Sequence, residues 1–187
     1  MVSLVDLWMP ILLSAVIVFV ASSIMHMALK YHASTYKRLP DEDKVLDAMR
    51  AAGAIQPGFY GFPYCQDMKQ MNEKPMLDKY NAGPVGTMTL RPRGPVQMGG
   101  FLLRWFLYSM LISFVCAYLA SRTLAPGTEY LQVFRVVGTA AWLAYAFGHI
   151  SDWIWKSEPG AMTAISIVDG LVYALLTAGT FGWLWPR

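Results

Sequence analysis

Four ionisable residues lie inside or at the ends of long apolar segments, where charge is otherwise rare: His26, His149, Asp152 and Asp169. Burying an ionisable group in a membrane is costly, so each is a candidate functional residue. Two imidazoles on facing helices can ligate a haem iron axially, and two imidazoles with carboxylates can hold zinc or iron. The residue types therefore indicate haem ligation by His26 and His149, a transition-metal site formed by all four residues, or a proton path.

The same residues have a purely structural interpretation. Hydrogen bonds among His, Asp and Tyr side chains satisfy buried polar groups and fix the register of neighbouring helices. The spacing of the four residues matches no known metal motif, and no CxxC pair accompanies Cys65 and Cys116. We therefore favour structural pairing, with a haem or a transition metal as the alternative cofactor.

The segments that carry these residues are long enough to cross a membrane. The chain is 56% hydrophobic and only 14% charged, and a bilayer core needs about 20 apolar residues in a helix. Short turns connect the last three segments, which makes successive helices antiparallel neighbours. We predict an all-α integral membrane protein, a single membrane domain of four antiparallel transmembrane helices over residues 7–29, 101–121, 129–152 and 160–186.

Helical periodicity predicts which faces turn inward. The first and third helices end at the side of the long loop, so His26, His149 and Asp152 should share one leaflet, with Asp169 deeper. His32 follows the first helix and joins the site only if the loop folds back. Inward faces are expected for Arg135, Gly138, Trp142, Tyr145, His149 and Asp152 in the third helix, for Ser166, Asp169, Tyr173, Thr177 and Thr180 in the fourth, and for Ser109, Ser113, Cys116 and Ala120 in the second.

Residues 30–100 form one long polar loop between the first two helices. Residues 41–52 have the pattern of a short amphipathic helix. FYGFPYC and VGTMTLRP have strand-like composition and are flanked by Pro and Gly, so we expect them to pair as a hairpin on the membrane surface.

Charge predicts the orientation. Ten of the fifteen Lys and Arg residues lie in the long loop, so the positive-inside rule places this loop in the cytoplasm and both termini outside. The net charge of +3 comes with no basic stretch interleaved with stacking aromatics, so we expect no nucleic-acid partner.

The stretches RTLAPGTEYLQVFRVVGT, GHISDWIWK and DGLVYALLTAGTFGWLWP resemble a family of small bacterial multi-pass membrane proteins of uncharacterised function. The resemblance implies the bacterial cytoplasmic (inner) membrane. It brings no activity, cofactor or site residue.

The sequence favours a non-enzymatic role. We expect a structural, accessory or partner-binding membrane protein that forms homo-oligomers or joins a membrane complex, because the small-residue face of the second helix and Gly99–Gly100 permit close contact. One alternative is a haem- or metal-binding protein that uses His26 and His149 and could act as an oxidoreductase. The other is a small transporter or proton-coupled channel centred on Asp169.

Overall fold

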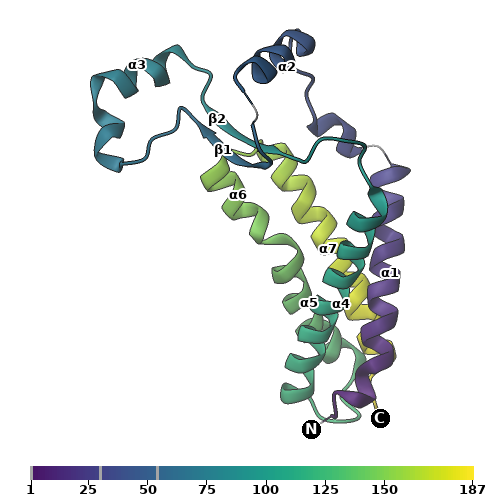
Figure 1. Cartoon of the computed structure of the whole chain (residues 1–187). Helices are drawn as coiled ribbons and strands as arrows, with labels where there is room; N and C mark the ends of the chain where they lie inside the picture. Colours follow the sequence, from purple (N-terminus) through teal and green to yellow (C-terminus); the bar gives the residue numbers. More distant parts are fainter. Residues whose placement is uncertain (1, 30, 54) are drawn as a thin grey trace. The chain divides into compact units, whose positions relative to one another are not determined.

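The computed structural model describes residues 2–29, 31–53 and 55–187, without the side chain of residue 34 (Figure 1). The described chain divides into two compact units. One consists of Met1–Tyr36 with Gln97–Arg187, and the other of Lys37–Val96.

The first unit contains four helical segments that are long and apolar enough to cross a membrane. They are α1 (Trp8–Met27, preceded by the 3-10 turn Val5–Leu7), α4 (Met98–Thr123), α5 and α6 together (Tyr130–Ala146 and Gly148–Lys156), and α7 (Gly160–Trp183). The four predicted apolar helices are confirmed. The second begins three residues earlier than predicted, at Met98 instead of residue 101, and the fourth ends three residues earlier, at Trp183 instead of residue 186.

The third segment differs from the continuous helix predicted over residues 129–152. It extends to Lys156 and is interrupted at Phe147, between α5 and α6. Here the Ile150 amide donates to the Phe147 carbonyl three residues back, at 3.2 Å, which is the bonding of a tighter turn. Gly148 follows, and glycine is the weakest ordinary helix former apart from proline. The bend places His149 at the start of a separate short helix.

Helix α7 is the centre of the packing, because both α5 and α1 lie against it, while α4 packs on α1 and α5. The predicted inward face of α7 is confirmed for Asp169, Tyr173, Thr177 and Thr180, which are all buried. The small-residue face of α4 is also buried. Its Ser113 hydroxyl shares a 2.9 Å hydrogen bond with Ser14 of α1. This face is therefore occupied by contacts within the chain.

The predicted inward stripe of the third helix is wrong at Arg135, which is exposed. The prediction is confirmed at Tyr145, and the other buried residues of α5 are Val133, Val137, Ala141 and Ala146. An unpaired buried guanidinium would be costly, whereas small apolar residues allow α7 to approach. A Cβ added at Gly138 would already lie 3.2 Å from the Cβ of Ala178.

The second unit contains a two-stranded sheet and two short helices. The elements are α2 (Glu42–Ala51), β1 (Gly58–Phe62), the 3-10 turn Met68–Asn72, α3 (Lys74–Ala82) and β2 (Gly86–Leu90). The strands pair antiparallel with Gly58 opposite Leu90 and Phe62 opposite Gly86. The predicted amphipathic helix and the pairing of the two strands are confirmed, and the connection between the strands contains α3.

Candidate functional site

The first unit contains a cavity of about 480 Å³ whose lining includes all three histidines of the chain. The end of α1, the 3-10 turn Tyr31–Thr35, and helices α4, α5, α6 and α7 contribute to its wall. Residues that define its chemistry are His26, His32, His149, Asp169, Trp105 and Tyr173.

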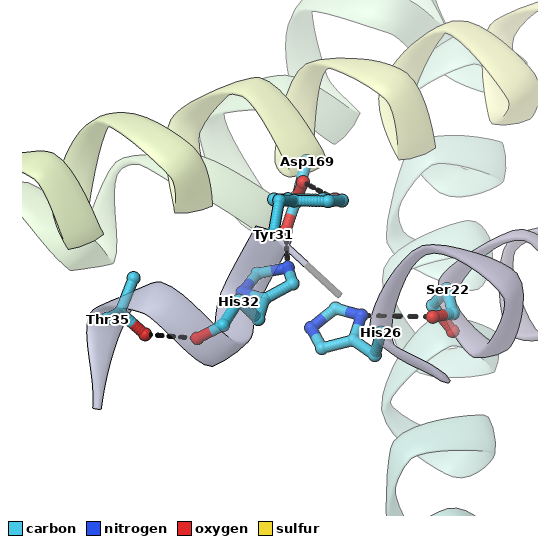
Figure 2. Close-up of polar contacts among 6 residues, drawn as sticks. All are labelled: Ser22, His26, Tyr31, His32, Thr35 and Asp169. Carbon is cyan, nitrogen blue, oxygen red and sulfur yellow. Dashed lines mark hydrogen bonds and ion pairs between the residues drawn. The ribbon is translucent and has the colours of Figure 1, made fainter. Parts of the chain in front are cut away.

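Asp169 is the anionic group of the cavity and is only 4% exposed. Figure 2 shows how the turn after α1 reaches this carboxylate on α7. The Tyr31 hydroxyl donates to Oδ1 at 2.5 Å, and Nε2 of His32 lies 2.7 Å from Oδ2. Oδ1 thus accepts a hydrogen bond, whereas Oδ2 lies at ion-pair distance from an imidazole nitrogen that makes no hydrogen bond within the described residues.

Tyr31 serves Asp169 as a hydrogen-bond donor. Burial, followed by the hydrogen bond and the negative charge at Asp169, raises the pKa of the Tyr31 hydroxyl above its ordinary value. A phenol with a raised pKa keeps its proton at neutral pH. Tyr31 therefore holds the carboxylate in one orientation without adding a second negative charge.

His26 lies in the last turn of α1 and has a defined tautomer. Its Nδ1 is 2.9 Å from the carbonyl oxygen of Ser22, and a carbonyl only accepts, so Nδ1 carries the proton and donates. The lone pair of neutral His26 is then on Nε2. The ring stacks on His32 with centroids 4.0 Å apart and an interplanar angle of 13°, and Figure 2 shows the two rings side by side.

Aromatic residues from three helices form much of the remaining wall. Trp105 and Tyr108 of α4 contact Tyr145 of α5, and Trp105 and Tyr145 both contact Tyr173 of α7, with ring centroids 5.6 to 6.3 Å apart. The Trp105 indole donates to the hydroxyl of Ser22 at 2.7 Å. Tyr173 is 3% exposed, and within the described part of the chain its hydroxyl has no hydrogen-bond partner.

The predicted site residues are divided between two clusters. His26 and Asp169 lie together, joined by His32, with one donor atom from each within 4.8 Å of the others. His149 and Asp152 belong to a second cluster with Glu158. His149 also lines the cavity, whereas Asp152 forms an ion pair with Lys156 at 2.6 Å.

Tyr31 and His32 are the site residues that periodicity did not identify. They follow the predicted membrane helix, and His32 is expected to join the site only if the loop folds back. The 3-10 turn Tyr31–Thr35 folds them back onto α7. Their one signal in the sequence is that a tyrosine and a histidine stand next to each other about one turn beyond His26. This signal identifies them as candidate site residues only once the direction of the chain after α1 is known.

Comparison of the chain with protein-family models, with curated proteins and with solved structures finds no match.

Proposed function

We propose that this chain is a multi-pass membrane protein whose four helices enclose a binding cavity for a small amphiphilic molecule. The membrane setting is supported by the four long apolar helices and by the large apolar side chains on their outer faces. Examples are Val20, Leu103, Leu111 and Leu175, each between 46% and 59% exposed. Such surface is costly in water and favourable in lipid.

The observation that carries the proposed ligand class is the composition of the cavity. Its volume of about 480 Å³ lies within the range of small-molecule sites, which combine apolar walls with a few convergent polar groups. The wall is aromatic, and polar groups gather around Asp169. The buried Tyr173 hydroxyl lacks a partner among the described residues, so a ligand oxygen that accepts a hydrogen bond from it would satisfy it.

The proposed topology follows from charge and connectivity. Antiparallel helices with a cytoplasmic loop place the end of α1 and the start of α4 in the cytoplasmic leaflet. These ends line the cavity, so the amphiphile would enter from that leaflet. The inner membrane stays a prediction.

The other predicted roles have less support. The α4 face expected to bind a second chain is buried inside this one. His26 shares its cluster with His32 instead of His149, which weakens the case for haem held by His26 and His149. Transport centred on Asp169 stays a prediction, and proteoliposome flux in Asp169→Asn would test it.

Photolabelling tests the cavity. Protein in mild detergent is irradiated with a diazirine-bearing alkanol, whose hydroxyl can accept from Tyr173, and the labelled peptides are identified by mass spectrometry. We expect saturable labelling of cavity-lining peptides of α4 and α7, suppressed by excess unlabelled alkanol and reduced in Tyr173→Phe.

Two tryptophan substitutions on α7 provide the matched control. Ser166 lines the cavity, whereas Ala164 is exposed. Ser166→Trp should abolish the saturable labelling, and Ala164→Trp should retain it. Labelling that is non-saturable, or that both variants lose equally, would contradict a specific binding cavity.

A further inference from the structure

We propose that His26, His32 and Asp169 form a binding site for one divalent transition metal, zinc or iron(II), at the polar end of the cavity. One donor atom from each residue lies within 4.8 Å of the others. Two imidazole nitrogens with one carboxylate oxygen suit these metals, and a site with three protein ligands keeps a position for water or a ligand. This metal site adds to the proposed binding cavity, and it rests on the proposed function only for the placement of the chain in a membrane.

The groups around the three residues resemble the outer shell of a metal site. A ligating histidine generally donates its second ring N–H to a backbone carbonyl or carboxylate, which fixes the tautomer and orients the ring. His26 does this through Nδ1 and the Ser22 carbonyl, so its Nε2 lone pair is available. Tyr31 holds Oδ1 of Asp169 and leaves Oδ2 as the ligand oxygen.

Binding requires one local rearrangement. His32 Nε2 and Asp169 Oδ2 are 2.7 Å apart, although within the described residues this nitrogen makes no hydrogen bond, and the His32 ring lies nearly parallel to that of His26. Parallel stacked rings cannot both direct an in-plane lone pair at one ion. The metal would take the place of the direct contact between His32 and Asp169, while His32 rotates out of the stack. The residue sits in a short turn outside the long helices, so this rotation leaves the helix packing in place.

The second cluster is a weaker candidate. Asp152 is neutralised by Lys156, and His149, Asp152 and Glu158 are all partly exposed. His149 therefore serves as an internal control, since it lines the same cavity as His26 and differs in its cluster.

The first experiment measures metal content. Protein purified in mild detergent is stripped with chelator, equilibrated with Zn²⁺ or Fe²⁺ alone, freed of excess ion and analysed by plasma mass spectrometry. We expect about one ion per chain in the wild type and in His149→Ala, and loss of the ion in His26→Ala, His32→Ala and Asp169→Asn. The His26 side chain is exposed, so its truncation should leave the fold intact.

Two further readouts separate ligation from stability. Co²⁺ bound to the wild type should show visible absorption bands of low-symmetry nitrogen and oxygen coordination, which requires no variant. Tyr31→Phe should bind Zn²⁺ roughly 10–100-fold more weakly, the usual effect of losing an outer-shell group. Metal-free wild type, a featureless Co²⁺ spectrum, or equal metal in His26→Ala and wild type would each overturn the site. Alkanol photolabelling of the stripped protein tests the cavity separately.

Discussion

The contact between α5 and α7 at Gly170 predicts a sharp effect of adding one methyl group. Gly170 follows Asp169 on α7, and a Cβ placed there would lie 2.8 Å from the Cβ of Ala146 and 3.1 Å from its backbone nitrogen. Carbon atoms pack favourably at about 3.5–4.0 Å. Gly170→Ala therefore requires the two helices to separate by about 1 Å beside the cavity.

The magnitude follows from two opposing effects. Overpacking of a tight contact costs typically about 1–3 kcal/mol, and here backbone atoms stand in the way, which favours the upper part of that range. The gain in helix propensity from glycine to alanine is about 1 kcal/mol at most. We expect Gly170→Ala to lower the free energy of unfolding by about 1–2 kcal/mol and to displace Asp169 relative to His32.

The assay measures stability in detergent. It uses reversible denaturation with sodium dodecyl sulfate and the thermal loss of the monodisperse peak in size-exclusion chromatography. Gly100→Ala on α4 is the control, because a Cβ there meets nothing within 4 Å. Removing the opposing methyl in the double variant Gly170→Ala/Ala146→Gly should restore part of the loss. The reasoning is refuted if Gly170→Ala is as stable as Gly100→Ala.

Three other predictions concern single interactions and topology. Ser113→Ala should lower stability by about 0.6 kcal/mol, the average for hydrogen bonds between membrane helices, in the same denaturation assay; no change would mean that the bond to Ser14 contributes nothing net. Trp105→Phe should cost about 1 kcal/mol through the lost bond to Ser22 and weaken alkanol photolabelling, whereas unchanged labelling would remove Trp105 from the binding wall. A C-terminal alkaline phosphatase fusion should be active and a green fluorescent protein fusion dark, and the opposite pattern would reverse the orientation.

The helical elements could be predicted because their cause is local. Long apolar runs need helices in lipid, and each run contains enough residues to show it. The inward face of α7 was also predictable, since its polar residues recur at helical spacing among apolar neighbours. Arg135 was misplaced because a periodic stripe identifies a face but does not say which helix packs on it.

The site was only partly predictable, because its contacts join distant parts of the chain. Tyr31 and Asp169 are 138 residues apart, and no periodicity relates them. Helix depth predicted that His26, His149 and Asp152 share one leaflet, which stays a prediction; His26 and His149 both line the cavity, and Asp152 does not. Helix depth could not show that the turn after α1 brings His32, and not His149, to Asp169.

The partners of Asp169 are informative about the role of the cluster of His26, His32 and Asp169, because the sequence alone would assign such polar residues to holding the helices together. Close helix contact is already provided by small residues, at Gly138 with Ala178 and at Gly170 with Ala146. The hydrogen bond and ion pair of Asp169 go instead to the 3-10 turn after α1. A charge buried to fix helix register would be expected to contact a neighbouring membrane helix. Contacts that hold a turn of Tyr and His residues beside a cavity are consistent with the proposed binding site, and the structural pairing that the sequence favoured stays a prediction.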